Sequence, residues 1–378
     1  MGGADLIFSK LEIEVLRLCA WCKDIPLDSA VFLTDGPIQI LLRLGCLRLS
    51  KCGTSYRVTP EGFRVLDAAG YHHEPDRQYR GRGKILDRRI QTAAITTFFY
   101  RCGADVFLNL PKPQTERLSF LPAFALRRNK GSNILGGTRL AGIAYTSSAA
   151  FIPYFISDDD KGIYANVEAR IFMSNHLLCG RTPIVLYTGK PHLAELIEAA
   201  QKARGKSPKS TTETYADAAY RFSCPVFYIP LSMDGVRQFQ IVSHMGYRER
   251  LMKYLLGKDY SPSILPHLDA QHKKSGELFL IGIDCDFIRM RRALETVRMP
   301  IHIIVLEFQL AAVSSLLRGE NAILHTLETG AAETILELNY PQLPISIPYQ
   351  TDKGGCLVVS NFPHHGSSQK QAKIELYE

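Results

Sequence analysis

The chain has 378 residues, of which 46% are hydrophobic and 22% are charged. These are ordinary globular values, so they exclude a disordered or collagen-like chain, and the length predicts about two or three domains. No apolar run reaches the roughly 18 residues that a membrane-spanning helix needs, which excludes a membrane partner. The N-terminus has no basic segment followed by an apolar one, so no signal peptide is expected. We therefore expect a cytoplasmic protein with reduced thiols.

The positive charge is concentrated near the N-terminus. Residues 1–130 hold 20 basic and 13 acidic side chains, so this third of the chain carries +7 of the net +8. Such an asymmetry is the footprint expected of a module that binds a polyanion. The alternative is a solvated basic surface that binds nothing.

The pattern of residues 1–70 predicts a winged helix-turn-helix domain. Apolar spacing indicates a helix over 10–22, a short helix after Pro26, and a third helix with Asp35 as its N-cap. Two short strands over 47–51 and 55–59 are joined by a tight link and read as a hairpin. A closing helix follows, with Thr59 as cap and Pro60 in its first turn. Three helices, a hairpin and a closing helix in this order resemble a winged helix-turn-helix.

In a winged helix, the third helix enters the major groove and the hairpin contacts the backbone or the minor groove. Basic and polar side chains of these two elements can neutralise phosphates or read base edges. The candidates for DNA contact are Gln39 and Arg43 on the third helix and Arg48, Lys51, Tyr56 and Arg57 on the hairpin. The alternative is a domain that pairs with itself in a homodimer, or with another protein, and never contacts DNA.

Residues 71–117 are predicted to form a basic linker followed by a helix over 84–101. Tyr71 and Tyr79 are interleaved with the arginines of the linker, and such a mixture can bind phosphates and stack on unpaired bases. The alternative is a solvated linker. The further candidates for DNA contact are Arg77, Arg80 and Arg82 in the linker and Arg88 and Arg89 in the helix.

Residues 118–362 are predicted to form an α/β domain, and residues 363–378 a polar tail that frays. Apolar strands alternate with helical segments, which is typical of a mostly parallel sheet covered by helices. The strands expected to precede helices lie over 183–187, 225–229, 278–283 and 301–306. Beyond Gly330, further strands are expected over 334–338, 345–349 and 356–359.

The sequence lacks complete cofactor motifs. Gly205-Lys206-Ser207 resembles the end of a phosphate-binding loop, but Ala200 stands where that loop needs its first glycine. Cys19 and Cys22 have a C-x-x-C spacing, but they lie in a predicted helix and lack the close second pair of a zinc site. No cofactor is therefore expected, with Mg²⁺ as the exception if the α/β domain is a nuclease.

Three carboxylates are weak catalytic candidates. Asp284 and Asp286 follow one predicted strand, and Glu307 ends the next. Ends of parallel strands are where α/β sheets place sites, so the three could hold Mg²⁺ for phosphodiester cleavage. The alternative, which we favour, is that Asp284 or Asp286 caps the helix that begins at Phe287. Restriction-type nucleases place a lysine two residues after the glutamate, and Gln309 stands there.

The chain resembles the replication-relaxation family of Firmicutes plasmids and conjugative elements over roughly residues 8–360. The resemblance is carried by the stretches Phe120–Lys130, Thr138–Ile143, Gly282–Asp286 and Leu306–Gln309. It implies a winged-helix protein of a mobile element that acts as an accessory factor in plasmid replication or conjugative transfer. Its partners would be DNA and a relaxase or replication protein. The resemblance also implies a nuclease-related α/β body, and Gln309 departs from an active one. A metal-dependent nickase is the alternative function.

Overall fold

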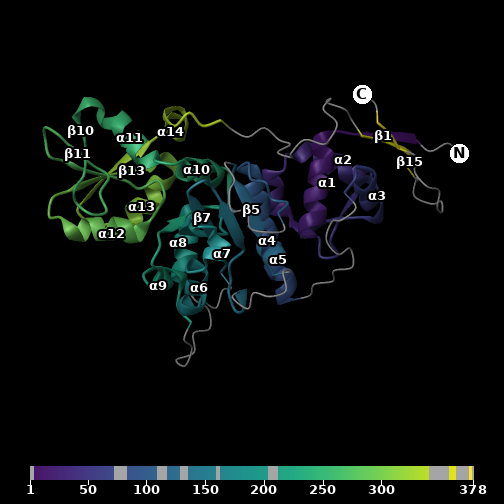
Figure 1. The fold of residues 1–378 in the computed structure, drawn as a ribbon, viewed down its shortest axis with the longest axis horizontal. Coiled ribbons are helices and arrows are strands. Elements are labelled where there is room, and N and C mark those ends of the chain that lie inside the picture. Colours follow the sequence, from purple (N-terminus) through teal and green to yellow (C-terminus); the bar gives the residue numbers. More distant parts are fainter. Residues whose placement is uncertain are drawn as a thin grey trace. The chain divides into compact units, whose positions relative to one another are not determined.

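The computed structural model describes residues 4–71, 83–108, 117–127, 135–158, 162–202, 212–339, 357–362 and 374–376. The chain is an α/β protein that divides into two compact units (Figure 1). Unit 1 comprises Met1–Phe107 together with Pro341–Glu378, and unit 2 comprises Leu108–Tyr340. Both ends of the chain therefore belong to unit 1, and unit 2 is inserted between them. The sequence-based division had instead assigned residues up to 362 to the α/β domain.

Unit 1 combines helices with two small antiparallel sheets. Its helices are α1 (Lys10–Cys22), the 3-10 helix η1 (Leu27–Phe32), α2 (Asp35–Arg43), α3 (Pro60–Ala68) and α4 (Lys84–Arg101). Its strands are β1 (Ala4–Phe8), β2 (Ile25–Pro26), β3 (Leu47–Leu49), β4 (Ser55–Val58), β15 (Leu357–Phe362) and β16 (Ile374–Leu376). One sheet has the order β2-β4-β3 and the other β1-β15-β16. β16 lies in the segment that the sequence predicted to be a frayed tail.

Local capping explains where the helices of unit 1 begin. Ser9 accepts from the backbone N–H of Glu12, whose carboxylate accepts from the N–H of Ser9 at 2.7 Å, and this capping box starts α1. Thr59 accepts from the N–H of Gly62 and so starts α3, as predicted. The prediction for α2 was wrong by one residue: Asp35 is its first residue, and the cap position is Thr34, which makes no side-chain cap bond.

The core of unit 1 lies between α1 and the elements packed around it. Val15, Leu16 and Leu18 of α1 are fully buried. α4 packs against α1, β2 and η1, and the rings of Phe98 and Phe32 meet edge to face at 5.8 Å between centroids. The helix over 84–101 was predicted with its correct bounds. Because it packs on η1 and β2, it belongs to the same compact unit as the preceding elements.

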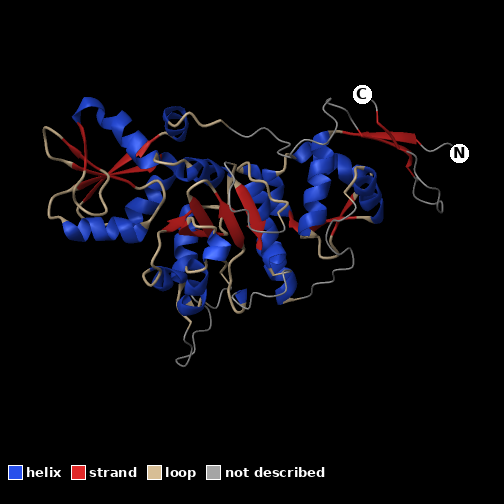
Figure 2. Cartoon of the chain, viewed as in Figure 1, coloured by secondary structure: helices blue, strands red, loops and turns tan. Residues whose placement is uncertain are grey.

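Unit 2 contains two five-stranded sheets with their own helices (Figure 2). The first sheet is formed by β5 (Ser119–Pro122), β6 (Gly142–Tyr145), β7 (Ala149–Phe155), β8 (Thr182–Thr188) and β9 (Val226–Tyr228). The second is formed by β10 (Tyr260–Pro262), β11 (Ala270–His272), β12 (Leu278–Ile281), β13 (Ile301–Leu306) and β14 (Ala322–Leu327). The helices are α5 (Ala123–Leu126), α6 (Ala165–Phe172), α7 (Asn175–Leu178), α8 (Leu193–Gln201), α9 (Tyr215–Ala219), α10 (Met233–Ser243), α11 (Tyr247–Leu256), α12 (Phe287–Thr296), α13 (Leu310–Leu316) and α14 (Thr329–Ile335), with the 3-10 turns η3 (Gly257–Asp259) and η4 (Glu307–Gln309).

The two sheets of unit 2 share one plan. In each, the strands follow sequence order across the sheet, the first two pairings are antiparallel and the last two are parallel. The prediction of a mostly parallel sheet is confirmed only for the strands joined by helices, such as β8 with β9 and β12 with β13. Each sheet is mixed, because its first three strands pair antiparallel. The short strands β10 and β11 carry too few residues for their periodicity to be seen in the sequence.

This strand order has a consequence for where a site can form. When neighbouring parallel strands follow one another in sequence, right-handed crossovers all lie on the same face of the sheet. The crossover helices α6, α7, α8 and α9 accordingly gather on one side of the first sheet (Figure 1). Ligand crevices in open α/β sheets form where crossovers change faces. Among the strands that the structure describes, neither sheet contains such a reversal.

In the C-terminal part, one predicted strand is wrong and one observed strand was not predicted. Residues 334–338, predicted as a strand, lie at the end of helix α14 and just beyond it. The strand β14 was not predicted, although it pairs with the whole length of β13. The strand over 356–359 corresponds to β15, whereas the one over 345–349 lies outside the described residues.

Candidate functional site

The outward side of α2 carries two of the predicted DNA-contacting residues. Ile38 and Leu41 point into the core and are 1% and 0% exposed. Gln39 and Arg43 lie one turn apart on the opposite side, and both are exposed. The amphipathic spacing of this helix therefore places the Gln39 and Arg43 side chains in solvent, as the sequence predicted.

The β3–β4 hairpin adds two exposed cations. Arg48 on β3 and Lys51 in the turn are both exposed, and α2 packs against β3. Within the part of the chain that the structure describes, no ion pair joins Arg43, Arg48 or Lys51 to a carboxylate. We call Gln39, Arg43, Arg48 and Lys51 the basic face.

The other two hairpin residues predicted to contact DNA, Tyr56 and Arg57, have structural roles instead. Tyr56 is only 9% exposed. Arg57 lies directly across the hairpin from Arg48, but its Nε donates to the buried carboxylate of Asp24. The same carboxylate accepts from the hydroxyl of Ser55 at 3.1 Å. Arg57 thus holds the hairpin to the end of α1, a role that the sequence did not reveal.

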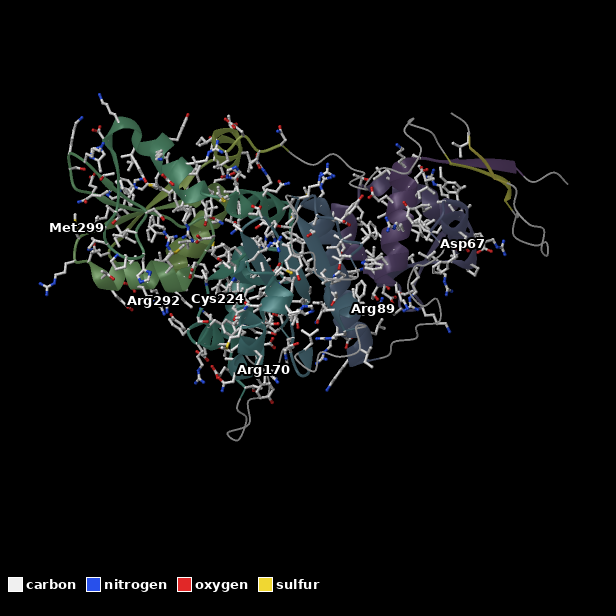
Figure 3. The ribbon with its side chains drawn as sticks, in the orientation of Figure 1. Asp67, Arg89, Arg170, Cys224, Arg292 and Met299 are labelled. Atoms are coloured by element: carbon white, nitrogen blue, oxygen red, sulfur yellow. The ribbon has the colours of Figure 1, made fainter. Side chains whose placement is uncertain are left out.

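The basic residues of α4 also divide into two kinds. Arg88 is exposed. Arg89, labelled in Figure 3, donates from Nε to the carbonyl of Cys22 at 3.0 Å and from Nη2 to that of Trp21 at 3.4 Å. A cation at the end of a helix satisfies carbonyls that lack intrahelical partners, so Arg89 fastens α4 to the C-terminus of α1. Arg77, Arg80 and Arg82 lie outside the described residues.

In unit 2, the candidate carboxylate Asp284 is the centre of a buried ion-pair cluster. Its Oδ2 accepts from the hydroxyl of Tyr247 at 2.6 Å and from Nε of Arg248 at 3.1 Å, and Nη1 of Arg289 lies 3.5 Å away. Burial would raise the pKa of Asp284, but the two guanidinium groups and the tyrosine hydroxyl hold it below its usual value. Arg289 also binds Asp269, so both arginines are committed to carboxylates of the fold.

Asp286 caps helix α12, as the alternative interpretation of the sequence proposed. Its Oδ1 accepts from the backbone N–H of Arg289 at 3.0 Å. Asp286 is 5% exposed, and burial together with the neighbouring charge of Asp284 raises its pKa to about 6. A carboxyl group with this pKa is suited to proton exchange near neutral pH. Asp286 makes no hydrogen bond to Glu307, the carboxylate that would complete the predicted metal site, because Glu307 is bound to Thr329.

Glu307 and Gln309 have structural partners as well. Both oxygens of Glu307 bind Thr329, the first residue of α14, one through its N–H and one through its hydroxyl, each at 2.8 Å. The side chain of Gln309 accepts from the N–H of Leu306 and donates to the carbonyl of Ile283 at 2.8 Å. Gln309, which stands at the sequence position of the nuclease lysine, therefore hydrogen-bonds to the backbone just beyond the end of β12.

Sequence reasoning missed the partners that occupy these groups. Arg248 is 36 residues from Asp284 and Asp24 is 33 residues from Arg57, so no local sequence pattern indicates these two pairs. It also missed Glu168 of α6, which is 1% exposed and accepts from the hydroxyl of Tyr154 at 2.8 Å and from the N–H of Arg139 at 2.8 Å. Burial raises the pKa of Glu168 to about 7 against the effect of these two hydrogen bonds.

Metal and membrane features can be stated only for the described residues. Across them, no three histidine, cysteine, aspartate or glutamate side chains are arranged to hold a metal ion. Cys19 and Cys22 are buried in α1, and burial raises the pKa of the Cys19 thiol. No helix in those segments has the length and apolar character required to cross a bilayer.

Comparison of the chain with protein-family models, with curated proteins and with solved structures returned no match.

Proposed function

We propose that unit 1 is a winged helix-turn-helix that binds duplex DNA through its basic face. The proposal is supported by the order of the elements: α1, the short strand β2, η1, α2, the β3–β4 hairpin and α3. β2 pairs with β4, so the strand after the first helix joins the sheet of the hairpin. In this arrangement α2 is the helix that enters the major groove, and the hairpin is the wing.

The exposed cations are the single observation that favours DNA over another partner. Arg43, Arg48 and Lys51 stand on the two elements that a winged helix presents to DNA, and no described carboxylate neutralises them. Arg57 and Arg89, by contrast, are held by Asp24 and by carbonyls of α1. Phosphate contacts by about three cations make binding sensitive to salt, because each contact releases counterions.

The resemblance to the replication-relaxation family supports a more specific role. Under the proposal, the protein is an accessory factor in replication or transfer of a mobile element, and unit 2 brings a relaxase or replication enzyme to the DNA. The contacts of Asp284, Asp286 and Glu307 favour a binding role for unit 2 over cleavage, because each carboxylate already serves the fold.

The experiment uses the full chain, since β1 pairs with β15 from the C-terminal segment. Fluorescence anisotropy measures binding to a random-sequence duplex between 50 and 200 mM salt. With about three phosphate contacts, the affinity should fall by roughly 40-fold over this range. The double variant Arg48→Ala/Lys51→Ala should bind more weakly, and the slope of log K against log salt should be smaller by about 2.

Arg292→Ala/Arg318→Ala is the matched control, because it removes two exposed charges from α12 and the end of α13 in unit 2 (Figure 3 labels Arg292). It should leave the salt slope unchanged. Equal slopes for both double variants would overturn the proposal, as would no binding to duplex DNA at about 50 mM salt. In that case light scattering tests the alternative: a tight dimer that Arg48→Ala/Lys51→Ala disrupts would identify the basic face as a protein interface.

A further inference from the structure

Gly36 lies in the first turn of α2, directly before Pro37, and no atom beyond its chain neighbours crowds it. It is exposed and lacks the positive φ that favours glycine, and a Cβ added to it would meet nothing within 4 Å. The space around Gly36 therefore leaves room for a methyl group on the outward side of α2.

Ile40 lies one turn further along the same side of α2. It is 40% exposed, although Ile38 and Leu41 on the other side are buried. Its neighbours on the exposed side are Gln39 and Arg43. Residues four and seven apart line one stripe of a helix, so Gly36, Ile40 and Arg43 lie on one stripe of α2. Along this stripe the first position has no side chain, the second is aliphatic and the third is a guanidinium group.

We propose that Ile40 determines which DNA sequence the basic face accepts and that Gly36 allows α2 to approach the DNA closely, an inference that rests on the proposed function. Ile40 contacts the 5-methyl group of a thymine in the major groove, the one apolar feature that groove presents. Gly36 lets the first turn of α2 lie against the DNA without a Cβ in between. Duplex DNA is the partner that this charge suits, because Arg43 extends the stripe and Arg48 and Lys51 are exposed on the hairpin whose strand β3 packs against α2.

The test of Ile40 removes single methyl groups from the DNA. The full chain first selects a preferred duplex from a random pool, and each thymine of that duplex is then replaced in turn by deoxyuridine. At one thymine the replacement should weaken binding of the wild type by about fourfold, the effect of burying one methyl group. Ile40→Ala should lose this sensitivity at the same thymine, and Ile40→Val should keep it.

The test of Gly36 separates binding from folding. Gly36→Ala should keep the protein folded, which a melting curve checks, yet weaken binding by roughly fivefold or more, because an extra methyl group overpacks the interface. Gly330→Ala is the matched control: it also adds a methyl group to a helical glycine, in α14 of unit 2, where the nearest atom is 3.8 Å away. It should leave binding unchanged.

The outcomes distinguish this inference from the proposed function. If the full chain binds no duplex, both fail. If it binds duplex with the expected salt dependence, but no thymine methyl matters and Gly36→Ala binds as well as the wild type, the inference fails and the proposed function stands. Equal sensitivity to deoxyuridine in the wild type and Ile40→Ala would show that another residue reads the thymine, which also overturns the inference.

Discussion

Asp24 and Arg57 are 33 residues apart in sequence, and their ion pair joins the end of α1 to strand β4. Asp24 is 3% exposed and also accepts from Ser55, so the carboxylate is satisfied only while the hairpin is docked. Arg48 faces Arg57 across the same two strands and has no such partner among the described residues. Two arginines that face each other across the hairpin therefore have different surroundings: Arg57 is paired with a buried carboxylate and Arg48 is exposed.

Arg57→Ala and Arg48→Ala should therefore separate stability from binding. Arg57→Ala leaves Asp24 buried without its cation, and we expect a loss of about 1–3 kcal/mol in the free energy of unfolding. Arg48→Ala should change stability little and weaken DNA binding. Urea denaturation and anisotropy on both variants check this. If Arg57→Ala unfolds at the same urea concentration as the wild type, the ion pair does not anchor the hairpin.

The neighbouring residues Arg88 and Arg89 provide a second matched pair. Arg89→Ala removes the donors that bind the carbonyls of Cys22 and Trp21, and we expect it to cost about 1–2 kcal/mol. Arg88→Ala removes the same charge from an exposed site and should cost less than about 0.5 kcal/mol. Thermal denaturation of the two variants compares them directly, and equal melting temperatures would contradict the prediction.

The buried Glu168 should make stability depend on pH. Its pKa is raised from 4.5 to about 7 in the folded protein, so the folded state holds the proton more tightly than the unfolded one. The stabilisation is complete below about pH 4.5 and is lost as pH rises through 7, with a total on the order of 3 kcal/mol. Glu168→Gln does not titrate: its amide oxygen can accept from the N–H of Arg139, and its amide N–H can donate to the hydroxyl oxygen of Tyr154. The difference in urea midpoint between Glu168→Gln and the wild type should therefore grow from pH 5 to pH 8, and a constant difference would contradict this.

Unit 2 should not cleave DNA. Supercoiled plasmid incubated with the full chain in Mg²⁺ or Mn²⁺ should stay supercoiled, because Asp284, Asp286 and Glu307 are bound by other groups of the fold. Asp286→Ser is the informative variant, since serine can still cap α12 but supplies no carboxylate. Nicking by the wild type that Asp286→Ser abolishes at unchanged stability would identify a nickase.

The C-terminal segment should stabilise unit 1. A chain that ends at residue 340 loses β15, the strand that pairs with β1. We expect a lower melting temperature and new protease cleavage within residues 4–8, because β1 then has no partner among the described strands. Limited proteolysis with mass spectrometry locates the first cleavage. An unchanged cleavage pattern would show that β1 does not depend on β15.

Local structure was predictable where its cause lies within a few residues. The bounds of α1 and α4 follow from apolar spacing, and α3 begins where Thr59 and Pro60 place its first turn. The strand β13 was predicted with its correct bounds because its six residues are apolar apart from one histidine. The shift of α2 by one residue has the same local origin, since Asp35 occupies the first helical turn and not the cap.

The tertiary structure alone decided strand direction and the partners of charged groups. Whether β10, β11 and β12 turn back or cross over depends on which surfaces they cover, and their short segments do not encode it. The sequence by itself determined an N-terminal basic module and an α/β remainder. It could not distinguish Arg43 and Arg48, which remain exposed, from Arg57 and Arg89, which bind groups 33 and 67 residues away. The reason is physical: a helix cap forms with neighbours in the chain, whereas a buried charge needs a partner that only folding brings close.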